Sequence, residues 1–204
     1  MVVVVWAAME TLTALEYAVA STAEIVKRTG PDQAALPTPC TEWNVRALLS
    51  HVIGTLWLTE ALFTGQAPRY PMAPGGLPGP AADGSAPGGD DAAAAYAEAA
   101  AAALAAVAAG NALTLMHVTP LGEMPGPLLA GFTTLDITVH GWDLARATGQ
   151  PADLDGRLAA HVLAFAEQTL ASADARGPRI GPARPVPDGA PVTQRLAAFL
   201  GRQP

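Results

Sequence analysis

The segment from Leu135 to Gly149 constrains the fold more than any other, because it places an acid and a histidine on the apolar side of a helix. Asp136 and His140 are four residues apart, a spacing that brings two side chains onto one helical face. Steps of three and four residues back from this pair reach a run of apolar side chains, namely Leu135, Phe132, Leu129 and Leu128. A carboxylate among leucines is costly unless it has a partner. The pattern therefore predicts a helical bundle that contains either a hydrogen-bonded Asp–His pair or a divalent metal site.

His51 is the candidate for a third ligand, since two ligands rarely hold a catalytic metal. Asn44 precedes a long apolar segment and is a good N-cap residue, so a helix is expected from Val45 to about Thr64. His51 lies at one edge of the buried side of that helix. It is either a core histidine bonded to a backbone carbonyl or the missing ligand.

Apolar residues at helical spacing predict most of the remaining chain to be helical as well. The further expected helices cover residues 11–28, 92–109, 128–148, 154–170 and 192–200. The helix at 92–109 is almost pure alanine, and it either packs closely against its neighbours or is an exposed segment of low complexity. Residues 113–118 are expected to be extended, 119–127 to be a turn, and 176–191 to be a loop or to hold a short strand. The fold class predicted is all-α, with extra C-terminal helices and one short β element.

The chain is expected to form one main domain. Residues 1–8 are interpreted as a leader or a disordered segment, 9–175 as a metal-binding helical bundle, and 176–204 as a tail whose short helix packs on the bundle. Within the bundle, residues 66–89 are half proline and glycine, which predicts a disordered crossover or a lid over a site. No pattern in the sequence predicts a second core.

Charge and cysteine content narrow the expected partners. The formal net charge of −7 leaves no basic stripe for phosphates, so nucleic acid is not expected as a partner. The single cysteine, Cys40, cannot form an internal disulfide, and this fits a reducing compartment. The apolar residues 1–8 lack basic residues and are too short to span a bilayer. We expect a cytoplasmic monomer or homodimer that acts on a small-molecule substrate and does not bind a membrane.

Two motifs carry a family resemblance. Thr38–Val52 and Asp136–Gly149 together resemble the metal-binding domain of the mycothiol-dependent maleylpyruvate isomerases, within the DinB-like superfamily of thiol-dependent transferases. Residues 181–202 resemble the tail of the short actinobacterial members. The resemblance implies a four-helix bundle with a long connection between the second and third helices, which corresponds to residues 66–89.

The resemblance also implies a ligand set. In such proteins a metal ion, usually zinc, is held by one histidine of the second helix and an acid–histidine pair of the fourth, which correspond to His51, Asp136 and His140. The family isomerase has glutamate as its acidic ligand, so Asp136 is one methylene shorter. The isomerase also has a separate C-terminal domain that contributes to substrate binding, for which this chain is too short, so maleylpyruvate itself is not the expected substrate.

Two imidazoles and one carboxylate leave coordination positions open, as in catalytic metal sites. The resemblance implies a zinc-dependent thiol S-transferase or isomerase that uses mycothiol and acts on a small electrophile, with no catalytic residues beyond the ligands. Two alternatives remain: a thiol-independent Lewis-acid isomerase or cyclase, and a non-catalytic metal-binding protein. The same ligands also suit iron or nickel.

Four further residues could belong to the site or have another role. Asp143 either orients a ligand imidazole or pairs with Arg146 on the surface. Cys40 is expected to be a buried structural residue, with a redox thiol as the alternative. His117 is interpreted as a loop or strand histidine and His161 as a solvated one.

Overall fold

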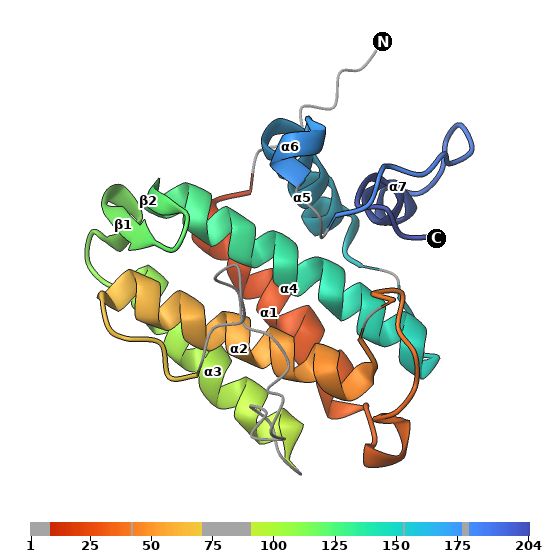
Figure 1. Cartoon of the computed structure of the whole chain (residues 1–204), viewed down its shortest axis with the longest axis horizontal. Coiled ribbons are helices and arrows are strands. Elements are labelled where there is room, and N and C mark those ends of the chain that lie inside the picture. The colour runs from red at the N-terminus through yellow and green to blue at the C-terminus, as the bar shows by residue number, and fades with distance from the viewer. Residues whose placement is uncertain (1–8, 42, 71–90, 153, 177–179) are drawn as a thin grey trace.

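A computed structural model describes residues 9–41, 43–70, 91–152, 154–176 and 180–204 (Figure 1). Four long helices form a bundle: α1 (Thr11–Lys27), α2 (Val45–Thr64), α3 (Ala92–Ala108) and α4 (Gly126–Thr148). The predicted all-α fold class is confirmed, since the described part of the chain contains only one small sheet besides its helices. Residues 1–8 and most of the expected crossover at 66–89 lie outside the described residues.

Shorter elements complete the fold. They are η1 (Pro31–Gln33), η2 (Ala112–Thr114), β1 (Met116–Thr119), β2 (Gly122–Pro125), α5 (Gly156–Thr169), α6 (Ala173–Arg176) and α7 (Val192–Phe199). In Figure 1, α5 lies beside α4, α7 packs against α5, and the two strands lie at one end of the bundle. The C-terminal tail therefore sits next to the helix that carries Asp136 and His140.

Local capping signals set the ends of the two helices that carry the candidate ligands. The Asn44 side chain accepts a hydrogen bond from the Ala47 amide at 2.9 Å, which satisfies a free donor at the start of α2 as predicted. Gly149 ends α4 with φ of 71°, a left-handed conformation that glycine adopts without strain. These caps fix which residues belong to each helix and so which side chains share a face.

Helix α1 packs closely against α4 through a small residue. A Cβ atom at Gly141 would collide with the side chain of Thr22, whose hydroxyl donates to the Ile137 carbonyl at 3.1 Å. The absence of a side chain at Gly141 therefore allows the two backbones to approach. This packing lies directly beside His140.

The alanine-rich helix α3 packs into the bundle rather than standing exposed. Ala99 and Ala103 are fully buried, and the buried Tyr96 hydroxyl donates to the Val19 carbonyl of α1 at 2.9 Å. Small side chains let α3 lie close to α1 and α2. Of the two alternatives for this segment, close packing is correct.

The structure corrects several of the predicted boundaries. Residues 119–127 are not a simple turn, because Gly122–Pro125 forms a strand antiparallel to β1, with Met116 opposite Pro125 and Thr119 opposite Gly122. The β element is thus a two-stranded hairpin. Helix α5 begins at Gly156 because the Asp155 side chain accepts from two amides at its start, and the alternative strand does not occur in residues 180–191.

Helix α2 has the length and composition of a membrane span, with 20 residues and a mean hydropathy of 1.3 over its most apolar 18-residue window. However, 78% of its most apolar window is buried inside the bundle. A helix that is apolar on most sides is expected at the centre of a bundle. Its apolar character is accounted for by its position in the core.

Candidate metal centre

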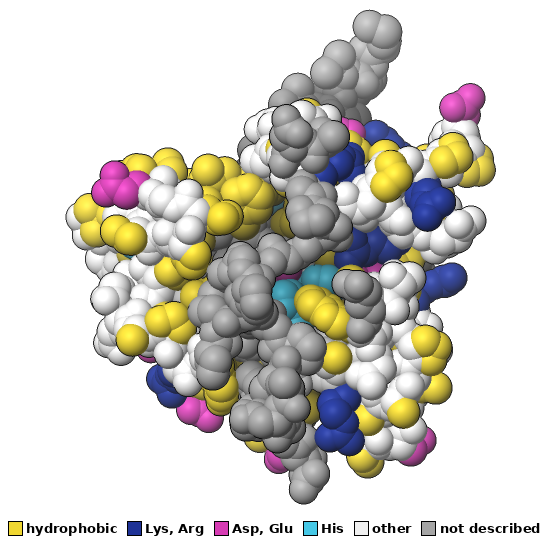
Figure 2. Space-filling model, in the orientation of Figure 1, with side chains coloured by type: hydrophobic (Ala, Val, Ile, Leu, Met, Phe, Trp, Pro, Cys, Tyr) yellow, Lys and Arg dark blue, Asp and Glu magenta, His cyan; other side chains and the backbone are white. Residues whose placement is uncertain are grey.

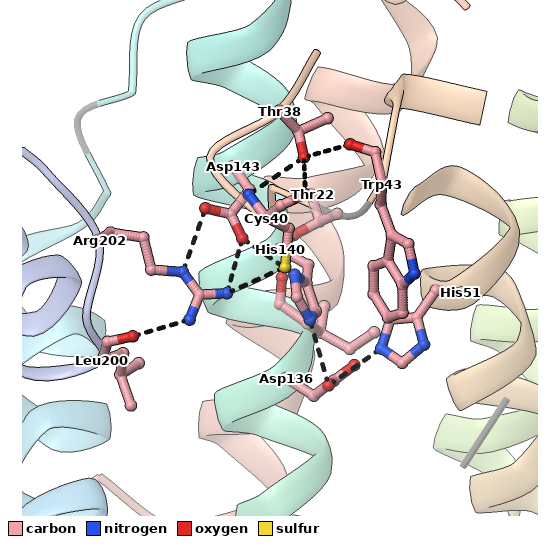
Figure 3. A network of polar contacts seen from close by, with 11 residues as sticks. Thr22, Thr38, Cys40, Trp43, His51, Asp136, His140, Asp143, Leu200 and Arg202 are labelled. Atoms are coloured by element: carbon pink, nitrogen blue, oxygen red, sulfur yellow. Dashed lines mark hydrogen bonds and ion pairs between the residues drawn. The ribbon is translucent and has the colours of Figure 1, made fainter. Parts of the chain in front are cut away.

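Three side chains that the sequence analysis singled out meet between α2 and α4 (Figure 3). The Nε2 atom of His51 lies 3.2 Å from Oδ1 of Asp136, and the Nε2 atom of His140 lies 3.5 Å from the same oxygen. One potential ligand atom from each residue lies within 4.8 Å of the other two. Helix α4 supplies the acid and one histidine from successive turns, and α2 supplies the other histidine.

The distances are compatible with a shared metal ion, although the 3.2 Å contact of His51 with Asp136 is also a hydrogen-bond distance. A tetrahedral zinc ion with ligands at about 2.0 Å separates its ligand atoms by roughly 3.3 Å. The distances at Asp136 are close to that value, whereas 3.5 Å is long for a nitrogen–oxygen hydrogen bond. Among the described residues, the other oxygen of Asp136, Oδ2, is buried and has no hydrogen-bond partner. The oxygen that faces both imidazoles is Oδ1, so a metal ion shared by the three side chains would bind there.

His140 lies between two carboxylates. Its Nδ1 atom is 3.0 Å from Oδ2 of Asp143, and its Nε2 atom faces Asp136. An imidazole that binds a metal ion through Nε2 keeps one proton, on Nδ1, and Asp143 is in place to accept it. The contact expected between Asp143 and an imidazole of the candidate ligand set is therefore present.

Both acids are held in the ionised form. Burial acts to raise the pKa of Asp136, but the charges of His51 and His140, together with hydrogen bonds from His51 and Thr55, outweigh it and hold the pKa well below its usual range. Burial acts in the same direction on Asp143, and the hydrogen bond from His140 together with the charge of Arg202 lowers the pKa of that carboxyl overall. Ionised carboxylates are the form that binds metal ions.

An arginine of the C-terminal tail completes the network behind His140. Arg202 contacts Asp143 twice, with Nη2 at 2.9 Å from Oδ2 and Nε at 3.3 Å from Oδ1. Its Nη2 atom also lies 3.6 Å from the sulfur of Cys40. Arg202 is not among the residues that the sequence predicts for the site, because a single arginine near the end of a tail has no periodicity or spacing that sets it apart. Cys40, which was expected to be buried, is partly exposed.

Trp43 covers one side of the two histidines. The centre of its ring lies 4.4 Å from that of His51 and 5.7 Å from that of His140. Figure 2 shows histidine side chains reaching the surface near the middle of one face, with hydrophobic side chains beside them. The Asp136 side chain is 25% exposed, whereas the side chains of His51 and His140 are 3% and 9% exposed. The centre is thus mostly shielded from water and open at the carboxylate.

The structure places the other two histidines away from this group. His117 is a strand histidine of β1, and its ring nitrogens lie 3.2 Å and 2.8 Å from the carbonyl oxygens of Leu62 and Ala112. His161 on α5 is partly buried rather than solvated, and burial lowers its pKa. Neither residue belongs to a potential metal-binding group among the described residues.

The fold and the site define a class of protein: a helical bundle in which two facing helices bring two imidazoles and a carboxylate into a group able to bind a metal ion. The model of the mycothiol maleylpyruvate isomerase N-terminal domain matches residues 15–145 of the chain. The chain therefore belongs to this family. The matched residues include all three candidate ligands, but not Arg202.

Two relatives are uncharacterised proteins of Mycobacterium tuberculosis, one from strain CDC 1551 / Oshkosh and one from strain ATCC 25618 / H37Rv. Each is 36% identical to this chain over 196 residues, which cover 95% of this chain and 98% of the relative. No solved structure matches the chain. The similarity to these relatives extends beyond the residues that the family model covers.

Proposed function

We propose that this protein binds one divalent metal ion, zinc by preference, through His51, Asp136 and His140, and uses it for thiol transfer or isomerisation. The substrate is a small electrophilic metabolite, and mycothiol is the thiol. The observation that supports this proposal most directly is the convergence of the three ligand atoms, which lie within 4.8 Å of one another. The family match supports the link to mycothiol.

A zinc ion at this position would supply Lewis acidity and hold a thiol as its nucleophilic thiolate. The residues of the chain prepare the site for that ion. Asp143 accepts the Nδ1 proton of His140 and so directs Nε2 toward Asp136. Trp43 lies against His51 and limits access of water from that side. The partial exposure of Asp136 leaves a route by which a small solute reaches the ligand group.

The net charge and the burial of α2 bear on the partners and the location of the protein. A net charge of −7 disfavours nucleic acid as a partner. The apolar helix α2 is mostly enclosed by the bundle, so its apolar surface is buried without a membrane. We place the protein in the cytoplasm, as a monomer or homodimer whose partner is a small molecule.

Metal content of the purified protein tests the first part of the proposal. Wild type, His51→Ala and His161→Ala are each prepared without a His-tag and assayed by elemental analysis. His161 on α5 is the matched control, because it is a histidine outside the ligand group. We expect about one zinc per chain in wild type and in His161→Ala, and a loss of zinc in His51→Ala. Wild type that takes up no zinc, iron or nickel on incubation would overturn the proposal.

Thiol dependence tests the second part. The zinc-loaded protein is mixed with mycothiol and a panel of small electrophiles, and thiol consumption and product formation are followed. We expect turnover that requires both mycothiol and His51. Turnover that is independent of thiol would instead support a Lewis-acid isomerase or cyclase. Binding of zinc without turnover of any compound would support a non-catalytic metal-binding protein.

A further inference from the structure

A second group of potential ligands shares His140 with the first. It consists of Cys40, His140 and Asp143, and one potential ligand atom from each lies within 4.8 Å of the other two. The two groups use opposite sides of one imidazole, since Nε2 faces Asp136 and Nδ1 faces Asp143 (Figure 3). A metal ion entering this region therefore meets two overlapping sets of ligands.

A cationic side chain already occupies the second group. The Nη2 atom of Arg202 lies 2.9 Å from Oδ2 of Asp143 and 3.6 Å from the sulfur of Cys40, so it contacts two of the three members. A metal ion bound between those two atoms would lie at about 2.0–2.3 Å from each of them and would have to displace the guanidinium. Its charge would also be repelled by the charge of Arg202.

The position of Arg202 is well defined by other contacts. Its Nε atom donates to Oδ1 of Asp143 at 3.3 Å, and its Nη1 atom donates to the Leu200 carbonyl at 3.0 Å. The Arg202 side chain is 9% exposed and that of Asp143 is fully buried. A paired contact of this kind fixes both the plane and the charge of the guanidinium. Arg202 is thus a buried and ordered part of the site rather than a nearby surface charge.

We propose that the guanidinium of Arg202 occupies the position that a metal ion would take in the Cys40–His140–Asp143 group. It thereby keeps the metal ion at the His51–Asp136–His140 group. The inference rests on the proposed function, because it requires that the protein binds a metal. Arg202 is a positioning residue: it acts through Asp143, which keeps the Nδ1 proton of His140 and leaves Nε2 as the ligating atom.

The chemistry of the second group gives the expected consequence of removing Arg202. Without the guanidinium, the buried carboxylate of Asp143 needs another cation. A thiolate is a strong ligand for zinc and cobalt, and its binding releases the thiol proton to solvent. A metal ion is therefore drawn to Cys40 and Asp143 once Arg202 has lost its charge.

Cobalt(II) is the probe for the test, because a cobalt–thiolate bond gives a near-ultraviolet charge-transfer band that nitrogen and oxygen ligands do not give. Wild type, Arg202→Met and Arg202→Gln are titrated with Co²⁺ and followed by absorption. We expect no such band in wild type and a band in both variants, whether one or two ions bind. The band is expected to disappear when Cys40→Ser is added to either variant. Arg202→Gln keeps a hydrogen-bond donor for Asp143 and serves if Arg202→Met folds poorly.

Two further variants separate a specific role of Arg202 from a general effect on the tail. Arg184→Met removes another arginine of the tail, one that bonds to the Gly201 carbonyl, and it should retain the spectrum of wild type. Arg202→Lys keeps the charge and should suppress the band. Affinity at the first group should also fall in Arg202→Met, by no more than the roughly 10–100-fold that loss of a direct partner of a ligand costs, because Arg202 acts through Asp143.

The outcomes distinguish this inference from the proposed function. If wild type binds Co²⁺ without a thiolate band and Arg202→Met gives the same spectrum and affinity, the inference is wrong and the metal site stands. A thiolate band in wild type would also overturn the inference, because Cys40 would then be a ligand in the presence of Arg202. Wild type that binds no Co²⁺ would overturn the metal site and the inference together.

Discussion

Gly141→Ala tests the close packing of α1 against α4 beside the candidate centre. The added Cβ would collide with Oγ1 of Thr22 and lie 3.3 Å and 3.4 Å from two of its carbon atoms. Thr22 is 1% exposed, so its side chain has little space to move into. The substitution adds one methyl group and changes no charge, which makes it a specific probe of this contact.

The structure gives two ways to relieve the collision. Thr22 can rotate, which breaks its hydrogen bond to the Ile137 carbonyl and leaves a buried hydroxyl unsatisfied, at about 1–3 kcal/mol. Alternatively the helices move apart, and overpacking of this kind costs about 1–3 kcal/mol. The better helix propensity of alanine offsets about 1 kcal/mol. We expect the free energy of unfolding of Gly141→Ala to fall by up to about 2 kcal/mol.

Urea unfolding at 25 °C measures this change, with an unchanged m-value as the check that only stability differs. In a Thr22→Ala background the hydroxyl is absent, so Gly141→Ala should cost nothing or stabilise the protein, giving a coupling energy of about 1 kcal/mol or more. Gly156→Ala is the matched control, because only a Val192 methyl lies near the added Cβ, at 4.0 Å. If Gly141→Ala stabilised the protein as much as Gly156→Ala, the reasoning about the α1–α4 contact would be refuted.

Three further substitutions and removal of the metal test other parts of the structure. Asp136→Asn should reduce zinc affinity by more than roughly 100-fold, because losing a ligand costs more than losing the hydrogen-bond partner of a ligand. Competition with a chromogenic chelator measures the affinity. An affinity equal to that of wild type would contradict the role of Asp136 as a ligand. Asn44→Ala should lower the free energy of unfolding by about 1 kcal/mol in urea through loss of the N-cap, whereas Asn44→Asp should not. Tyr96→Phe should cost about 1 kcal/mol in the same assay, because the Val19 carbonyl loses its buried donor. Chelation of the metal should lower the Tm of wild type but leave that of His51→Ala unchanged.

Features that depend on local sequence were predictable. Asn44 and Gly149 mark helix ends because a side-chain oxygen and a left-handed glycine act within one turn of themselves. The pairing of Asp136 with His140 follows from helical spacing alone. The approach of His51 to that pair depends on how α2 is rotated against α4, which periodicity does not specify, and it was expected because of the family resemblance.

Features that depend on distant parts of the chain were not predictable. Strand β2 was interpreted as a turn because it begins at Gly122 and ends at Pro125, and both residues favour turns. A two-stranded sheet can nevertheless hold a glycine and a proline at the ends of a strand. The Arg202–Asp143 contact joins residues 59 positions apart. No local pattern distinguishes Arg202 from an arginine that points into solvent.

The same contact has a consequence for how a buried charge is neutralised during folding. The Arg202–Asp143 contact spans 59 positions and the His51–Asp136 contact spans 85, so chain entropy does not delay the tail relative to the contact between the helices. Until the tail docks, the carboxylate of Asp143 has no guanidinium to balance its charge, and burying it in that state is costly. Docking of the tail is therefore the step that neutralises Asp143, and the core around this carboxylate is complete only when Arg202 is in place.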